Sequence, residues 1–181
     1  MYDTVAEAVA RHPEINASIV YVPPAAAAGA ARSAVAAGIR RVFVTTERVP
    51  HHDMLDLIEA AEAAGACVIG PNTIGAISPG ACVVGLIGAR ADHARHVFRP
   101  GSVGVLSRSG GQTTTVSYYL TRRGIGQSTA LCVGGDPFVG TGWARILDRF
   151  EADSSTRAVV AFGEMAQKPD APFMGAAAAR G

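Results

Sequence analysis

The sequence predicts an α/β fold with two consecutive parallel-sheet units. Short runs of β-branched residues alternate with alanine-rich amphipathic stretches, and glycine or proline turns separate them. This order is typical of β-α-β units, in which a helix crosses over the sheet between two parallel strands. The 181 residues, 49% of them hydrophobic and 17% charged, also suffice for a buried core without disulfides or a structural metal.

Residues 15–72 are predicted to form strand, helix, strand, helix, strand. The strands are apolar and rich in β-branched residues, and both helices end near glycines, Gly38 and Gly65. The expected elements are, in order, 18–22, 25–37, 41–45, 53–64 and 67–70. Residues 1–10 are expected to be helical, with no strand and no glycine-rich loop before the strand at 18. A Rossmann-type site normally begins with such a strand and loop, so we expect the start of the domain to be cut.

The second unit follows a glycine-rich stretch without helix signals, residues 71–88, and a basic segment, residues 90–99. We place the domain boundary between residues 99 and 100. The expected strands and helices of the second unit are, in order, 102–106, 112–123, 128–133, 141–150 and 158–162. The tail after Glu164 shows no strand that would complete the unit, so this end is also expected to be cut.

Charge and cysteine usage exclude several classes of function. Sixteen basic and fifteen acidic residues give a net charge of +1, which leaves no electrostatic footprint for a nucleic-acid backbone. Cys67, Cys82 and Cys132 are odd in number and far apart, which indicates neither a disulfide framework nor a zinc site and fits a reducing cytoplasm. The apolar runs are shorter than the roughly 18 residues of a membrane span, and the first residues do not resemble a signal peptide.

The residues that follow each strand are the candidate ligand site, because ligands of open α/β sheets bind beyond the carboxyl ends of the strands. The clearest pattern is Ser-Arg-Ser-Gly-Gly at 107–111, between a strand and a helix. Its backbone N–H groups and the positive end of the helix favour a phosphate or phosphoryl group. An ordinary N-capped helix after a flexible turn is an equally good interpretation of this pattern. Neither a Gly-Lys-Ser phosphate loop nor Gly-x-Gly-x-x-Gly occurs.

Other strand ends carry further candidates. Thr45, Thr46 and Asn72 could hold a flat, polar adenosine-type ligand. Gly-Gly-Asp-Pro at 134–137 is either a loop in close approach to the same ligand or a tight turn, and the turn is favoured. Glu164 ends the last expected strand and could orient a histidine or phosphoryl acceptor, although a solvated carboxylate is the more usual case.

Taken together, the strand-end motifs form an ordered series. They are Tyr-Val-Pro-Pro at 21–24, Thr-Thr-Glu at 45–47, Ile-Gly-Pro-Asn at 69–72, Val-Gly-Val-Leu-Ser-Arg-Ser-Gly at 103–110, Gly-Gln-Ser-Thr at 126–129, Gly-Gly-Asp-Pro at 134–137 and Gly-Glu at 163–164. Each motif alone is weak evidence. In this order, from about residue 4 to about residue 165, the series resembles the alpha subunit of succinate–CoA ligase (succinyl-CoA synthetase), an acid–CoA ligase.

The resemblance implies an incomplete Rossmann-like CoA-binding domain at 1–99 and an incomplete flavodoxin-like ligase domain at 100–181. It implies a subunit of an ADP- or GDP-forming enzyme that makes acyl-CoA from a small carboxylic acid, CoA and a nucleoside triphosphate. The reaction of that family passes through an acyl phosphate and a phosphohistidine. The implied partner is a beta subunit of ATP-grasp fold, or a fused beta-like domain, which would bring ATP or GTP with Mg²⁺. Neither nucleic acid nor a membrane is an expected partner.

Carried over by matching motif, the resemblance implies two groups of site residues. The CoA pocket would be lined by Val22, Pro23, Thr45, Thr46, Glu47, Pro71 and Asn72. The phosphoryl group would be held by Ser107, Ser109, Gly110 and Gly111, with Glu164 orienting the phosphohistidine.

The departures from the family limit these expectations. The glycine-rich CoA loop and the glycine-flanked phosphorylated histidine have no counterpart, so no catalytic residue is assigned and the chain alone is expected to be inactive. The family continues Ser-Arg-Ser-Gly with a Thr-Tyr-Glu-like element, where this chain has Gly-Gln-Thr-Thr-Thr at 111–115, so the acid could differ from succinate. Two other interpretations are a non-catalytic CoA-binding or regulatory module of the same fold and, less favoured, a nucleotide-binding oxidoreductase domain.

Overall fold

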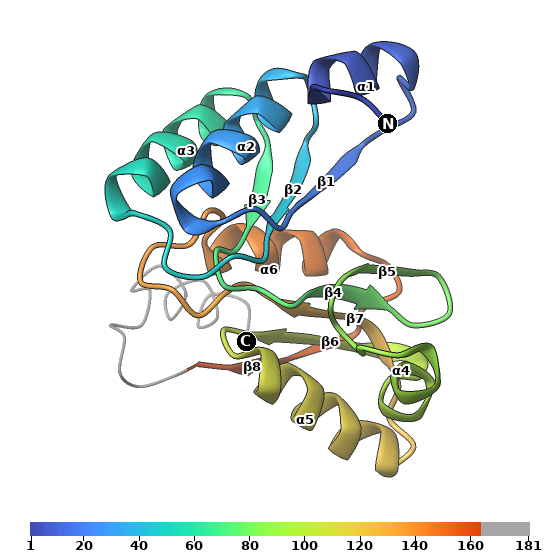
Figure 1. Ribbon diagram of the computed structural model, residues 1–181. Coiled ribbons are helices and arrows are strands. Elements are labelled where there is room, and N and C mark those ends of the chain that lie inside the picture. Colours follow the sequence, from blue (N-terminus) through green and yellow to red (C-terminus); the bar gives the residue numbers. More distant parts are fainter. Residues whose placement is uncertain (164–181) are drawn as a thin grey trace.

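The computed structural model describes residues 1–163, which form two β-sheets and the helices around them (Figure 1). The elements of the first unit are α1 (Val5–Arg11), β1 (Ala17–Val20), α2 (Pro24–Ala36), β2 (Arg41–Val44), α3 (His51–Ala63) and β3 (Cys67–Ile69). Its strands pair in parallel in the order β1-β2-β3. The alternation of strand and helix that was predicted for residues 15–72 is confirmed, with element ends shifted by a residue or two.

Alternate residues of the first sheet face opposite sides. Val42, Val44 and Val68 are fully buried against α2 and α3, while Phe43 and Ile69 face the other way. The side of α2 that touches the sheet is made of alanines, which let the helix approach closely. They are Ala27, Ala28, Ala31 and Ala34, each at most 1% exposed.

The second unit contains a mixed five-stranded sheet. Its elements are β4 (Gly75–Ser78), β5 (Cys82–Gly85), α4 (Ala91–Val97), β6 (Pro100–Ser107), α5 (Gly110–Arg122), β7 (Gln127–Cys132), α6 (Trp143–Ala152) and β8 (Ala158–Phe162). The strand order is β5-β4-β7-β6-β8, in which β6 runs parallel to β7 and β8. The β-α-β alternation predicted after residue 100 is confirmed up to β8.

The hairpin of β4 and β5 is a difference from the sequence prediction, which assigned no element to residues 71–88. Its two strands are short, and β4 pairs antiparallel with both β5 and β7. Because β7 lies more than forty residues further along the chain, the local sequence gives no sign of this pairing. The hydrogen-bonded sheets therefore divide between β3 and β4, and the predicted domain boundary between residues 99 and 100 stays a prediction.

Helix α6 lies between the two sheets and contacts both (Figure 1). Its apolar residues Trp143, Ile146 and Phe150 recur at spacings of three and four, which places them on one side of the helix. The cluster around them includes Phe43, Cys67 and Ile69 of the first sheet and Leu106, Leu131 and Val133 of the second unit. The opposite face of the second sheet is covered by α4 and α5.

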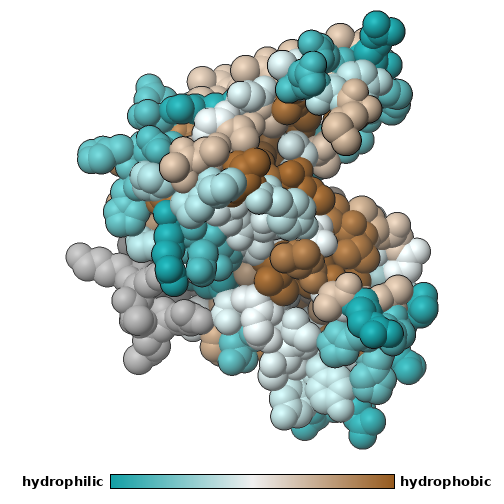
Figure 2. Space-filling model, viewed as in Figure 1, coloured by the Kyte–Doolittle hydropathy of each residue, from teal (hydrophilic) through white to brown (hydrophobic). Residues whose placement is uncertain are grey.

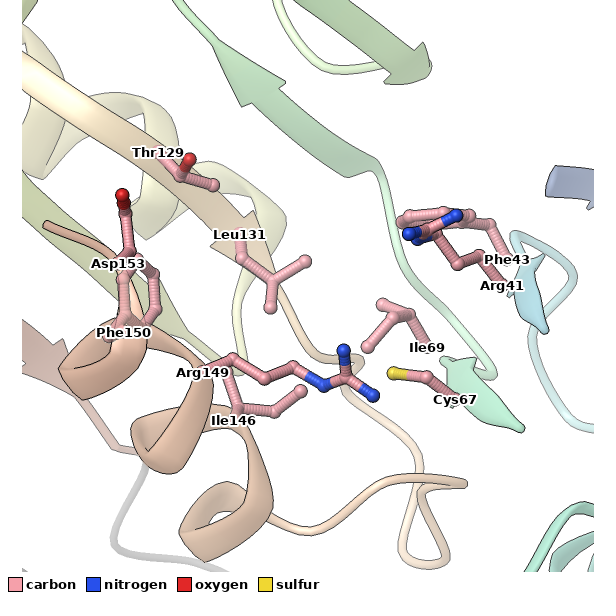
Figure 3. Close-up of a pocket in the computed structure, with 10 residues that line it drawn as sticks. All are labelled: Arg41, Phe43, Cys67, Ile69, Thr129, Leu131, Ile146, Arg149, Phe150 and Asp153. Atoms are coloured by element: carbon pink, nitrogen blue, oxygen red, sulfur yellow. The ribbon is translucent and has the colours of Figure 1, made fainter. Parts of the chain in front are cut away.

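A cavity of about 220 Å³ lies beside α6, between the two sheets (Figure 3). Its apolar lining comes from both sheets and α6, with Phe43, Ile69, Leu131, Ile146 and Phe150. In Figure 3 the side chain of Arg149 extends toward Cys67 across this cavity. Figure 2 shows apolar side chains gathered in the hollow between the sheets, and Ile19 of β1 is 40% exposed. Part of the first sheet is therefore open apolar surface.

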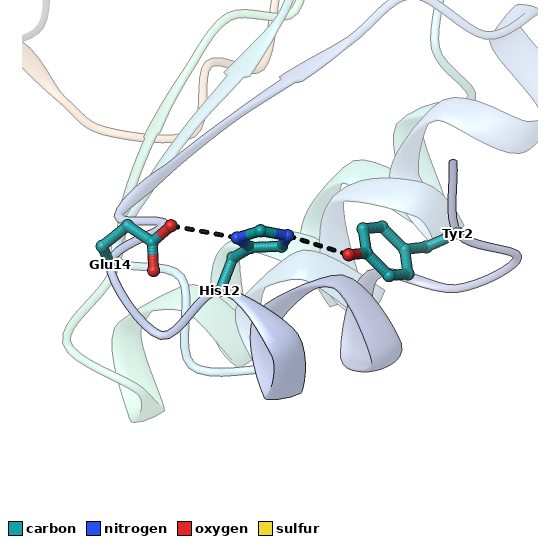
Figure 4. A network of polar contacts seen from close by, with 3 residues as sticks. All are labelled: Tyr2, His12 and Glu14. Carbon is teal, nitrogen blue, oxygen red and sulfur yellow. Dashed lines mark hydrogen bonds and ion pairs between the residues drawn. The ribbon is translucent and has the colours of Figure 1, made fainter.

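A polar network fixes the turn between α1 and β1 (Figure 4). The imidazole of His12 bonds the Tyr2 hydroxyl (2.8 Å) at one nitrogen and the Glu14 carboxylate (3.1 Å) at the other. A backbone N–H and the His12 side chain hold the pKa of the Glu14 carboxyl below its usual value. All three groups are exposed, so the network orients a turn and contributes little to the stability of the fold.

The packing predicts how the three thiols react. Cys82 is exposed on β5, whereas Cys67 and Cys132 are buried in β3 and β7. We expect Ellman's reagent to titrate one thiol rapidly in the native protein and three thiols in denaturant. The fast phase should disappear in Cys82→Ser. Rapid reaction of two or three native thiols would contradict the packing of β3 and β7.

Within residues 1–163, no helix combines the length and the apolarity that crossing a bilayer requires.

Candidate functional site

The loops at the carboxyl ends of the strands of both sheets meet and are joined by backbone hydrogen bonds. The N–H of Asn72 donates to the carbonyl of Thr46 (2.9 Å), and the N–H of Gly135 donates to the carbonyl of Asn72 (3.1 Å). The N–H of Gly70 donates to the carbonyl of Val133 (3.0 Å). The N–H of Val133 in turn donates to the carbonyl of Ser107 (2.8 Å). The predicted CoA residues Thr46 and Asn72 therefore lie at the same edge as Ser107 of the predicted phosphoryl group.

The threonines predicted for the CoA pocket bond to the protein itself. The hydroxyl of Thr45 donates to the carbonyl of Val20 (2.8 Å), and that of Thr46 donates to the carbonyl of Val22 (2.7 Å). These bonds join the loop after β2 to the end of β1 and leave the hydroxyl oxygens as acceptors. The threonines thus fix the loop after β2, and their contact with CoA stays a prediction.

The other predicted CoA residues differ in exposure. Val22, Pro23 and Glu47 are exposed, while Asn72 is half-buried. Pro71 is buried and follows a cis peptide bond. Three of the seven residues are therefore open to a ligand, and their contact with CoA stays a prediction.

Ser109 caps helix α5. Its hydroxyl oxygen accepts from the N–H of Gln112 (3.4 Å), and its carbonyl accepts from the hydroxyl of Thr113 (2.8 Å). Ser107 is fully buried, and its hydroxyl both donates to the carbonyl of Ser109 and accepts from its N–H, each at 3.0 Å. Both serines therefore fix the loop, which confirms the N-cap that the sequence left as one of two interpretations.

The first turn of α5 has the backbone features that can favour an anion. The first N–H groups of a helix have no intrahelical acceptor, and they carry the positive end of the helix dipole. Gly111 is exposed, and a Cβ there would meet only the Ser109 hydroxyl oxygen, at 3.9 Å, so the space beside this residue is open. At Gly110 a Cβ would lie 2.7 Å from a methyl group of Ile74, so glycine is required for the loop after β3 to approach. Phosphate binding here stays a prediction.

The Gly-Gly-Asp-Pro loop is in close contact with the loops around it. Gly134 has φ +116°, and a Cβ there would overlap the carbonyl oxygen of Pro71. The carboxylate of Asp136 accepts from the N–H of Arg48 (2.7 Å) and from the side-chain amide of Asn72 (3.1 Å). The sequence favoured a tight turn here over close approach to a ligand. It gave no sign of these contacts with the protein's own loops, because they join residues far apart in the chain.

An open hollow of about 400 Å³ lies beside Asp136, lined by the loop after β2 and the loop after β7. The imidazole of His51, the first residue of α3, packs edge-on against Phe138 with ring centroids 5.0 Å apart. Neither Arg48 nor His51 was singled out for this edge of the sheet from the sequence. The only sequence signal for Arg48 is its position directly after the Thr-Thr-Glu motif.

Two other predictions concern Glu164 and metals. Glu164 lies outside the described residues, so its predicted role stays a prediction. Across residues 1–163 no three His, Cys, Asp or Glu side chains form a group that could hold a metal ion.

The chain is similar to several known proteins. Residues 1–48 match the CoA binding domain family. The chain is 43% identical over 165 residues to the Archaeoglobus fulgidus succinate–CoA ligase [ADP-forming] subunit alpha 2, covering 91% of the chain and 55% of that protein. It is 36% identical, with the same coverage of both chains, to the ADP-forming sulfoacetate–CoA ligase subunit SauD of Bilophila wadsworthia.

A solved structure shows the same arrangement of elements. ATP citrate lyase from Methanothrix soehngenii, in complex with citrate and coenzyme A, superimposes with a TM-score of 0.86 at 26% identity. The match covers 93% of this chain and 28% of that one. The chain spans about half the length of the curated relatives it matches. Over 91% of its length, the chain is therefore similar to subunits of ADP-forming acid–CoA ligases, among them the alpha subunit of succinate–CoA ligase.

Proposed function

We propose that this chain is part of the alpha-subunit component of a nucleotide-dependent acid–CoA ligase, and that its strand-end loops bind CoA. The observation that carries the proposal is the hydrogen bonding of Asn72, in the loop after β3, to Thr46 in the loop after β2 and to Gly135 in the loop after β7. Gly135 in turn lies next to Arg108, just before the start of α5. An acid–CoA ligase must bring the CoA thiol to an acyl phosphate. A CoA pocket and a phosphoryl site must therefore be adjacent, as these loops are.

Different residues of the chain would bind CoA and the phosphoryl group. The exposed Val22, Pro23 and Glu47 would contact CoA on the first sheet. The N–H groups of Gly110 and Gly111 would hold the phosphoryl group, and the Ser109 cap fixes the turn that presents them. Bound phosphate would gain from the helix dipole because the site lies at the N-terminus of a 13-residue helix.

Several parts of the reaction would come from elsewhere. None of the five histidines lies between glycines, so a phosphorylated histidine of the family type would belong to another segment or subunit, with Glu164 orienting it. A beta subunit of ATP-grasp fold, or a fused equivalent, would bring ATP or GTP with Mg²⁺. The acid would be a small carboxylate, since the relatives are named for succinate and sulfoacetate. A cytoplasmic location stays a prediction.

The CoA site is tested by titrating the chain with CoA in a calorimeter. We expect one CoA per chain, and about tenfold weaker binding in Glu47→Gln, which removes a charged hydrogen-bond acceptor. The matched control is Glu59→Gln, the same change at an exposed position of α3. Absence of heat with the unaltered chain at high micromolar CoA would contradict the proposal, as would equal effects of the two variants.

A non-catalytic CoA-binding module of the same fold is the second candidate, because no glycine-flanked histidine occurs in these 181 residues. Both candidates predict CoA binding, so a second measurement must separate them. Acid-dependent formation of ADP or GDP, measured with the full-length protein and its beta subunit, would support the ligase. CoA binding without any such turnover would support the module.

A further inference from the structure

The side chain and backbone of Asp136 contact three loops at once. Its carboxylate oxygens accept from the N–H of Arg48 (2.7 Å) in the loop after β2 and from the amide of Asn72 (3.1 Å) in the loop after β3. Its backbone carbonyl accepts from the guanidinium of Arg108 in the loop after β6. Asp136 itself belongs to the loop after β7, so four strand-end loops meet at this one residue.

Two of the bonds hold residues in a conformation that L-residues rarely adopt. Arg48 has φ +59° and Asn72 has φ +58°, both in the left-handed region. Asparagine tolerates this region, whereas arginine does so only where its surroundings hold it there. An ionised carboxylate that accepts from the N–H of Arg48 provides such a constraint, because charged hydrogen bonds are stronger than neutral ones.

The third contact of Asp136, with Arg108, lies next to the predicted phosphate-binding loop. Arg108 directly precedes Ser109, the cap of α5, and its own carbonyl accepts from the thiol of Cys132 (3.4 Å). The guanidinium bond to Asp136 therefore orients the residue that leads into the first turn of α5. Thr46 and Glu47 lie directly before Arg48 on the other side. Asp136 lies between the predicted CoA residues and the predicted phosphate residues.

We propose that Asp136 is a positioning residue that sets the CoA-binding loop and the phosphate-binding loop relative to each other. The inference rests on the proposed function, and Asp136 is assigned no contact with either ligand. This positioning role has a consequence for both ligands. Removing the negative charge at this position weakens both CoA and phosphate binding, although the residues that touch each ligand are unchanged.

The test replaces Asp136 by asparagine in the 181-residue chain. Asparagine has the same shape, but it is uncharged and has one acceptor oxygen in place of two, so at most one of the bonds from Arg48 and Asn72 keeps an acceptor at position 136, and that acceptor carries no charge. We expect binding of CoA, measured by calorimetry, and of inorganic phosphate, followed by the amide shifts of Gly110 and Gly111, each to weaken by about tenfold, the effect of one charged hydrogen bond.

Three matched variants separate positioning from direct contact and from general destabilisation. Glu47→Gln should weaken CoA binding alone, and Ser109→Ala should weaken phosphate binding alone. Asp153→Asn is the same change at an aspartate whose side chain, among residues 1–163, bonds its neighbours Ser155 and Thr156, and it should weaken neither. Asp136→Glu keeps the charge and both acceptor oxygens, and it should recover part of both affinities.

The ligand-free amide spectrum gives a readout that needs no binding. Asp136→Asn should shift the amide resonances of Arg48 and Ser109 together, whereas Asp153→Asn should shift neither. Intact binding of both ligands by Asp136→Asn, or loss of only one, would overturn the inference while leaving the proposed function standing. If the unaltered chain binds neither ligand, the proposed function fails. Unmoved resonances in Asp136→Asn would then overturn the positioning role as well.

Discussion

Alanine in place of Gly134 is expected to destabilise the fold by about 3 kcal/mol, the sum of left-handed strain and overpacking. The φ of +116° at Gly134 lies outside the range that L-residues adopt readily. A Cβ would also overlap the carbonyl oxygen of Pro71 and lie 3.0 Å from the Cα of Gly70. Both neighbours are backbone atoms, so neither can move away by changing a rotamer.

Gly124→Ala is the matched control for this prediction. Gly124 also has positive φ, +75°, but a Cβ there would meet nothing within 4 Å. We expect a loss of about 1 kcal/mol in the control, from backbone strain alone. In thermal unfolding, Gly134→Ala should lower Tm by about 10 °C and Gly124→Ala by about 3 °C for a chain of this size. Equal losses in the two variants would contradict the close approach of the 134–137 loop to Pro71.

Phe150→Ala should lower the free energy of unfolding by about 3–5 kcal/mol, the usual range for a buried aromatic residue. The ring is 7% exposed and lies in the cluster that joins α6 to both sheets. It also fills the space over Gly104, where a Cβ would lie 2.7 Å from a ring carbon. The change would leave a cavity continuous with the one beside α6, which the ring already lines.

The control for Phe150→Ala is Leu55→Ala on α3, where the side chain is 46% exposed, and we expect a change within about 0.5 kcal/mol. Urea unfolding gives both values. Hydrogen exchange shows which strands are destabilised, and both sheets should be affected because α6 packs on both. Phe150→Ala should reduce amide protection in β2 and β3 as well as in β6 and β7. Reduced protection in the second sheet alone would show that α6 does not stabilise the first.

Local patterns in the sequence were enough to predict most helices and strands. The alanine-rich stretch of α2 and the apolar run of β2 are patterns of a few residues, and such patterns persist in the fold. The Ser109 cap was also foreseeable, because a cap joins residues only three apart. The ordered strand-end motifs identified the acid–CoA ligase resemblance for the same reason, since each motif is short and continuous.

Features formed by distant residues were not predictable. The β4–β5 hairpin is placed by its antiparallel pairing with β7, and nothing in residues 75–85 specifies that partner. The Gly-Gly-Asp-Pro loop was interpreted mainly as a turn, because its contacts with Arg48 and Asn72 span 88 and 64 positions of the chain. Thr45 and Thr46 were expected to face a ligand, and the structure shows that their hydroxyls also bond to β1 and the residues after it.

The sequence by itself determined the α/β class, the order of its helices and strands, and the relationship to acid–CoA ligase alpha subunits. These depend on period, caps and short motifs, which act over a few residues. Only the tertiary structure decided that α6 lies between the two sheets, that the hairpin joins the second sheet, and that Asp136 ties four loops together. Those arrangements depend on packing and hydrogen bonds between residues that the chain separates widely, and such contacts form only when the whole core is assembled.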